Sequence, residues 1–181
     1  YSYNVLEGLR KNGVFVLNTI WNEEELNDRL PGEMKRYIAE NNINFYTINA
    51  VKIAQEIGLG GRINMIMQAA FFKLANIIPV DEAIKYLKDA VVTSYGKKGE
   101  KVVNMNYAAI DKGLESVVKI NVPDSWKDAK DDKVEENVSV PDFVRDICMP
   151  INKLQGNNLP VSAFVNNKIE DGTFMHGTTK Y

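Results

Sequence analysis

Residues 13–19 read GVFVLNT, and residues 43–50 read INFYTINA. The first run is continuously apolar, which is typical of a strand buried on both faces, and the second is rich in β-branched and aromatic residues. Between them, residues 21–42 predict two helices separated by a Pro-Gly break, and residues 51–58 predict a third helix that ends at a glycine. This order is the rhythm of a parallel sheet covered by helices. We therefore predict an α/β fold, a layered α/β/α Rossmann-like sheet domain.

Helical patterns dominate the next part of the chain. Residues 62–78 are apolar nearly all round, which predicts a helix buried between layers, whereas residues 79–96 and 100–120 each carry one apolar stripe. Two strands cannot support so many helices. Either KINV (119–122) and VSAFV (161–165) contribute strands, or the sheet domain is incomplete at its N-terminal side.

The domain organisation follows from a change of composition near residue 122. We expect an α/β domain over residues 1–122, a charged linker bracketed by prolines over 123–141, and a further segment over 142–181. That last segment predicts one helix, 142–155, and is otherwise a mostly irregular C-terminal extension. Because the chain enters its first element directly from Tyr1, we also expect it to be a piece of a longer polypeptide.

Composition excludes several classes of protein. The 181 residues carry a net charge of −2, so there is no basic field for nucleic acid. No apolar stretch is long enough to span a bilayer and no signal peptide is evident, which predicts no membrane partner. Cys148 is the only cysteine and His176 the only histidine, so this chain alone can form neither an internal disulfide nor a four-thiolate metal site. Scarce cysteine suits a cytoplasmic location.

The sequence EIGLGGRINMIM (56–67) contains the best candidate for a binding site. Gly60 and Gly61 would let a ligand approach the backbone, and Arg62 would lie at the start of a helix whose free N–H groups favour an anion. Asn64 lies in the first turn. We predict phosphate or carboxylate recognition here. The alternative is that Arg62 pairs with a carboxylate of the protein and Asn64 satisfies a loop carbonyl.

Both predicted strands end in asparagine, at Asn18 and Asn49. Ligands in open α/β sheets bind beyond the carboxyl ends of strands, so these amides point toward any site. The alternative is that asparagine simply favours turns. Elsewhere we find no carboxylate pair and no metal-ligand cluster, so we predict no catalytic and no metal-binding residue in this chain.

Four segments together resemble one known family. They are GVFVLNTIWNEEEL, INFYTINAVKIAQEIGLGGRINMIMQAAFFKL, KKGEKVVNMNYAAID and LPVSAF…IEDGTF…GTT.Y, in this order, and they are similar to consecutive parts of pyruvate:ferredoxin (flavodoxin) oxidoreductases. The resemblance implies an internal fragment, with the later part of a gamma-type domain followed by the start of a small connecting domain.

The resemblance also implies a function for the intact protein. The family oxidises and decarboxylates pyruvate on thiamine diphosphate with Mg²⁺, passes electrons through 4Fe–4S clusters to ferredoxin or flavodoxin, and transfers the acetyl group to coenzyme A. Members of this kind work as homodimers, and the other domains of the same polypeptide are the fragment's partners. The fragment itself would bind none of these cofactors except coenzyme A.

The resemblance implies a role for only a few individual residues of this chain. It associates the gamma-type domain with coenzyme A, and implies Arg62, with Asn64, Gly60 and Gly61, as residues that contact it. A second hypothesis is a purely structural, inter-domain element without a ligand site. A third, an independent nucleotide-binding module, is disfavoured because GLGG lacks the spacing of known phosphate loops.

Overall fold

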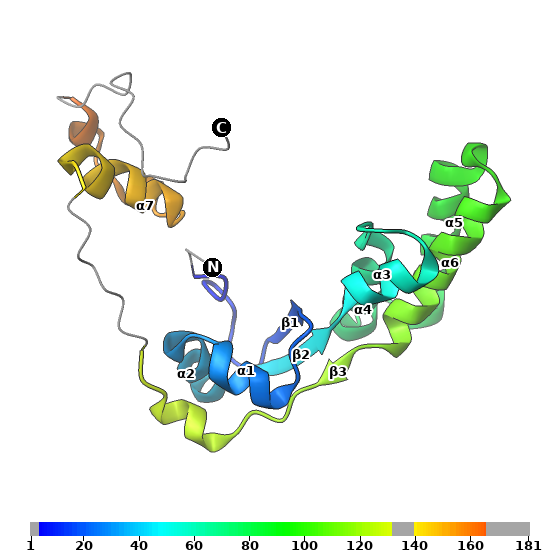
Figure 1. Cartoon of the computed structure of the whole chain (residues 1–181), viewed down its shortest axis with the longest axis horizontal. Coiled ribbons are helices and arrows are strands. Elements are labelled where there is room, and N and C mark those ends of the chain that lie inside the picture. The colour runs from blue at the N-terminus through cyan, green and yellow to red at the C-terminus, as the bar shows by residue number, and fades with distance from the viewer. Residues whose placement is uncertain (1–3, 132–139, 166–181) are drawn as a thin grey trace. The chain divides into compact units, whose positions relative to one another are not determined.

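The computed structural model describes residues 4–131 and 140–165, which divide into two compact units. The larger unit comprises residues 9–131. The described residues of the other are 4–8 and 140–165. Figure 1 labels the helices and strands of both.

A small mixed sheet is the centre of one half of the larger unit (Figure 1). Strands β1 (Val14–Asn18) and β2 (Asn44–Ile48) are parallel, with Phe15 opposite Phe45. Strand β3 (Val118–Lys119) joins the other edge of β2 in the antiparallel direction, which gives the order β1-β2-β3. The two predicted strands, their parallel pairing and the α/β class are therefore confirmed, and the KINV segment supplies the third strand in part.

Two helices connect β1 to β2, as the pattern predicts. They are α1 (Glu23–Arg29) and α2 (Gly32–Glu40). Helix α1 begins with a capping box in which the Asn22 side chain accepts from the N–H of Glu25, and the Glu25 carboxylate accepts from the N–H of Asn22. These reciprocal bonds explain why the acidic run 23–25 starts a helix there.

The charged segment after the sheet is partly packed. Residues Asp124–Asp128 form a 3-10 helix, and Trp126 within it is 2% exposed. Its indole Nε1 donates to Oδ1 of Asn27 at 2.9 Å, and its ring lies 6.2 Å from that of Phe45. The expectation of a surface linker is therefore wrong for this stretch, because the buried Trp126 packs it against Phe45 and Asn27. Residues 132–139 of the predicted linker lie outside the described residues, and the predicted domain boundaries stay predictions.

The first strand is less buried than its sequence suggests. Only Leu17 of β1 is buried, and Val14 is 40% exposed. Val16 packs with Ile48 against the helices that follow β2, but that cover does not extend to Val14. Burial of β1 on both faces was thus a wrong prediction: an apolar run shows what a strand can bury, and the neighbouring layers decide what it does bury.

Four helices form the other half of the larger unit. They are α3 (Ala50–Ile57), α4 (Asn64–Ala75), α5 (Val80–Tyr95) and α6 (Glu100–Glu115). Helices α4, α5 and α6 pack on one another, and α3 contacts both α4 and α6. Their shared interior consists of two clusters of small and branched side chains: Ile48, Ala50, Ile53, Ala54, Leu59, Ile66, Ala70 and Ala109, and then Ala69, Leu87, Val91 and Ile110.

Helix α4 differs most from its prediction. It ends at Ala75, where Asn76 takes a left-handed conformation with φ of 47°. One side is buried at Ile66, Ala69 and Ala70, but Phe71 is 53% exposed. Burial all round was therefore wrong. Helix α6 also ends earlier than predicted, because residues 118–119 are taken by β3.

The described residues of the other unit contain one helical segment and two 3-10 turns. A π-helical stretch, Val144–Cys148, continues into α7 (Met149–Asn152), so a helix lies within the predicted range 142–155. Beyond the turn at Gly156–Asn158, residues Val161–Phe164 form a 3-10 turn after Pro160, so the alternative that VSAFV adds a strand is wrong. The last part of the expected irregular extension, 166–181, lies outside the described residues, as does His176.

Candidate functional site

A short loop connects α3 to α4 and displays the predicted site. At the end of α3, Gly58 adopts φ of 89°, and the N–H of Leu59 donates to the carbonyl of Ala54 at 2.8 Å. This is the usual way in which a helix is ended by glycine. The Leu59 side chain is 7% exposed and belongs to the core. The loop is thus fixed at its base, and the residues after Leu59 lie at the surface.

Gly60 and Gly61 leave open space above the backbone. Gly60 has φ of 62°, a conformation that other residues adopt only at a cost. Its chain neighbours apart, a methyl group added at either glycine would meet no heavy atom of the described residues within 4 Å. The backbone of this loop is therefore accessible to a ligand.

Arg62 follows directly and is exposed. Its backbone N–H donates to the carbonyl of Leu59 at 3.2 Å, which holds the loop in a turn. Among residues 4–131 and 140–165 its guanidinium forms no hydrogen bond and no ion pair, and the amide of Asn64 likewise has no partner there. Neither of the alternative contacts, with a carboxylate or a loop carbonyl, is formed in this part of the chain.

The start of α4 differs from the starts of α1 and α3 in its cap. Among the residues that the structure describes, no side chain accepts from the first turn of α4, whereas Oδ1 of Asn49 accepts from the N–H of Lys52 at the start of α3, at 3.0 Å. The free N–H groups and the helix dipole give the start of α4 a partial positive charge. Together with the Arg62 guanidinium, they make this surface suitable for an anion.

The two strand-end asparagines have local roles. Oδ1 of Asn18 accepts from the N–H of Ala50 at 3.0 Å, and Asn49 caps α3 as described above. Both amides therefore stabilise the passage from the sheet into α3. Their preference for turns and caps explains them without a ligand.

A groove lies beside the loop, and the sequence alone does not predict it. It runs between the end of α3 and the first half of α6, and it is lined by Ile57, Glu100, Lys101, Asn104, Met105 and Ala108. No sequence signal identifies it, because α6 residues outside the apolar stripe look like an ordinary solvated face. In the part of the chain that the structure describes, no cluster of three or more His, Cys, Asp or Glu residues could hold a metal. No helix there has the length and apolarity needed to cross a membrane.

Comparison with known proteins gives two family matches. Residues 1–116 match the family described as pyruvate ferredoxin/flavodoxin oxidoreductase, and residues 129–181 match a domain of unknown function.

Two relatives match almost the whole chain. A pyruvate:ferredoxin oxidoreductase of Moorella thermoacetica is 55% identical over 179 residues, and a pyruvate-flavodoxin oxidoreductase of Enterobacter agglomerans is 54% identical. Each alignment covers 99% of this chain and 15% of the relative. The chain thus spans about 15% of the length of these relatives.

One solved structure supports the fold. It is the PORC subunit of a pyruvate oxidoreductase from Thermotoga maritima, with a TM-score of 0.50 and 20% identity over 64% of this chain and 57% of that subunit. At this identity the likeness concerns the fold alone.

Proposed function

The chain belongs to the pyruvate ferredoxin/flavodoxin oxidoreductase family, and from this premise we propose that it is the part of such an enzyme that holds coenzyme A at the start of α4. The full-length protein would convert pyruvate and coenzyme A into acetyl-coenzyme A and CO₂, with the electrons passed to ferredoxin or flavodoxin. The names of the relatives support the enzyme class. The family resemblance found in the sequence is confirmed by the match over residues 1–116.

The redox cofactors of the proposed enzyme would lie in other parts of the full-length protein. Thiamine diphosphate with Mg²⁺ would supply the carbanion chemistry, and 4Fe–4S clusters would carry the electrons. The residues of this chain do not fit a cluster, because Cys148 is its only cysteine. We therefore propose that this chain binds and positions coenzyme A, in a homodimeric, cytoplasmic enzyme whose other domains are its partners.

Within residues 4–131 and 140–165 the guanidinium of Arg62 is exposed and has no partner, and this observation carries the coenzyme A proposal. An exposed arginine beside a helix start that no described side chain caps is suited to binding a phosphate. Its planar fork can donate to two phosphate oxygens at once. Coenzyme A carries a diphosphate and a further ribose phosphate, so it has the groups that such a surface recognises.

The other three residues have distinct parts in the proposal. Gly60 and Gly61 let a phosphate approach the backbone without meeting a side chain. The Asn64 amide, at the first position of α4, would donate to the same ligand. Holding a thiol carrier in a fixed position converts a bimolecular step into an effectively intramolecular one, which accelerates acyl transfer without any catalytic group on this chain.

The test is the substitution Arg62→Ala in the full-length oxidoreductase. We expect the apparent KM for coenzyme A to rise about tenfold or more, because a charge-assisted hydrogen bond is lost, while the KM for pyruvate is unchanged. Arg10→Ala, another exposed arginine, is the matched control and should leave both constants unchanged. An unaltered coenzyme A dependence in Arg62→Ala would refute the proposal.

A structural role is the second candidate, and a specific observation favours it. Phe71 on α4 is 53% exposed and Ile77 beyond it is 69% exposed, and exposed apolar side chains that form a contiguous patch mark a packing surface. In this alternative the chain would serve to fix other domains. Phe71→Ser would then lower the thermal stability of the full-length protein, whereas Arg62→Ala would change neither stability nor coenzyme A dependence.

A further inference from the structure

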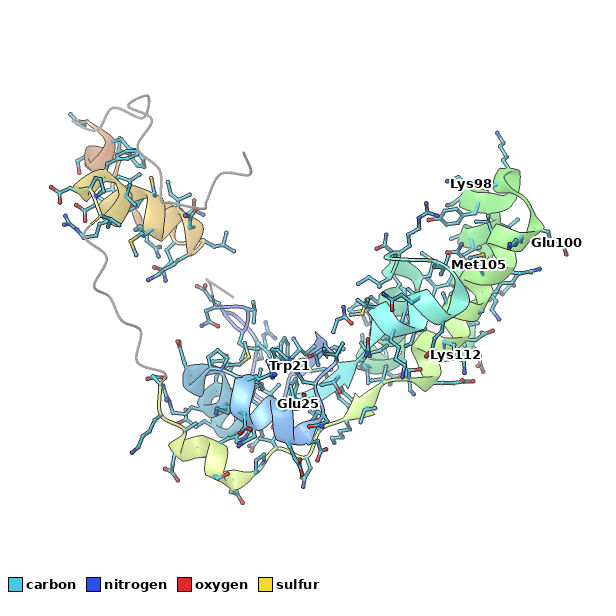
Figure 2. All side chains as sticks on the ribbon, in the orientation of Figure 1. Trp21, Glu25, Lys98, Glu100, Met105 and Lys112 are labelled. Atoms are coloured by element: carbon cyan, nitrogen blue, oxygen red, sulfur yellow. The ribbon has the colours of Figure 1, made fainter. Side chains whose placement is uncertain are left out.

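The groove beside the α3–α4 loop is open and about 620 Å³ in volume. Its walls come from the last residue of α3, Ile57, and from the first half of α6. In Figure 2 the labelled side chains of Glu100 and Met105 mark the part of α6 that forms it, and Lys112 marks the later part of the same helix.

The groove adjoins the loop that ends in Arg62. Ile57 directly precedes Gly58, the residue that ends α3. A methyl group added at Gly58 would lie 3.3 Å from Cε of Met105. Met105 therefore lies against the residue that ends α3, so the groove begins directly beside the loop.

The lining of the groove combines two kinds of surface. Ile57, Met105 and Ala108 give an apolar floor, and Glu100, Lys101 and Asn104 give a polar rim. The three rim residues are exposed, and within residues 4–131 and 140–165 their side chains form no hydrogen bond or ion pair. The rim offers acceptors and donors together, and its carboxylate opposes the binding of a phosphate in the groove itself.

We propose that this groove binds the pantetheine arm of coenzyme A, an inference that rests on the proposed function. The arm is a neutral chain of methylene groups, one dimethyl-substituted carbon, one hydroxyl and two amides, and it ends in the thiol. Its methylene groups match the floor, and its amides match a rim that can both donate and accept. The phosphates would lie at Arg62 and the start of α4, so the loop and the groove would hold the two chemically different parts of one ligand.

The experiment compares two ligands on the full-length oxidoreductase by calorimetry, without turnover. Coenzyme A has the arm, whereas 3′,5′-ADP keeps the adenosine, the 3′-phosphate and one of the two 5′ phosphates but lacks the arm. Asn104→Ala removes an exposed amide from the rim, and Ala108→Phe fills the floor. Lys112→Ala, on the same helix but outside the groove, is the matched control.

We expect each groove variant to weaken coenzyme A about threefold to tenfold or more and to leave 3′,5′-ADP within about twofold of the unmodified protein. Asn104→Ala keeps the test valid if Ala108→Phe fails to fold, because it changes only an exposed polar side chain. Lys112→Ala should bind both ligands normally.

Two other outcomes would overturn the inference, and they can be told apart. In the first, Arg62→Ala weakens the binding of both ligands, but the groove variants either leave the binding of both unchanged or weaken the two equally. The groove then does not bind the arm, and the proposed function stands. If Arg62→Ala weakens neither ligand, the proposed function fails and the groove proposal fails with it.

Discussion

The side of α4 that faces α6 and the loop that leads into α4 use glycine for opposite purposes. On the α6 side, Ile66, Ala69 and Ala70 are fully buried, and Gly113 of α6 lies against Ile66 and Ala69. A methyl group at Gly113 would lie 2.5 Å from the carbonyl oxygen of Ile66. In the loop, a methyl group at Gly60 or Gly61 would meet nothing within 4 Å.

This difference separates a structural glycine from one that leaves room for a ligand. Gly113 is required because two helix backbones approach closely, and the space it leaves is filled by protein. The loop glycines leave space that the described part of the protein does not fill. Substitutions at Gly113 and at the loop glycines should therefore change the free energy of unfolding by very different amounts.

The largest effect is expected for Gly113→Ala. The new methyl group would force α4 and α6 apart, and this cost should exceed the roughly 1 kcal/mol that alanine gains over glycine in a helix. We expect the free energy of unfolding, measured in urea, to fall by about 2 kcal/mol. An unchanged stability would mean that the helices are less tightly packed than described.

Gly60→Ala should have the next largest effect, for a reason of conformation and not of space. With φ of 62°, an alanine would be strained by about 1 to 2 kcal/mol. Gly60→Asn should cost less, because asparagine tolerates the left-handed region. If the two variants unfold at the same urea concentration, strain at this position is not the cause.

Asn49→Ala sharpens the contrast between the capped start of α3 and the uncapped start of α4. Losing the bond to the N–H of Lys52 should lower the free energy of unfolding by about 1 kcal/mol. Asn64→Ala is the matched control at α4, since its side chain caps nothing among the described residues, and thermal unfolding should hardly change. Equal losses would contradict the view that the start of α4 is free.

The smallest effect on stability is expected for Gly61→Ala. This glycine has open space above it and no left-handed conformation, so the free energy of unfolding should change by less than about 0.5 kcal/mol. Under the proposed function, the methyl group should nevertheless raise the KM for coenzyme A. A loss of stability as large as that of Gly113→Ala would contradict the view that the loop glycines, unlike Gly113, have open space above them.

Much of the fold was predictable because it depends on local patterns. Strands β1 and β2 follow from runs of apolar and β-branched residues, and helices α1 to α3 follow from the acidic run, the Pro-Gly break and the closing glycine. The family also followed from local segments, since residues 1–116 match it.

What failed depended on partners distant in the sequence. Trp126 lies in a charged stretch whose composition predicts a linker, yet it is buried through Phe45 and Asn27, more than eighty positions earlier in the chain. The apolar side of α4 that carries Phe71 was expected to be buried because its sequence permits burial. A single sequence contains no signal for which element covers which face.

At the candidate site, the sequence by itself determined three local features. Glycines end α3 and leave the loop backbone accessible, an arginine follows them, and no capping residue precedes α4. These are local properties, because a backbone conformation and a helix start depend on a few neighbouring residues. Only the tertiary structure decided that Arg62 stays unpaired among the described residues and that α6 lies beside the loop to form a groove. Both depend on how elements far apart in the chain pack together, and that packing is set by the whole core and by no single stretch.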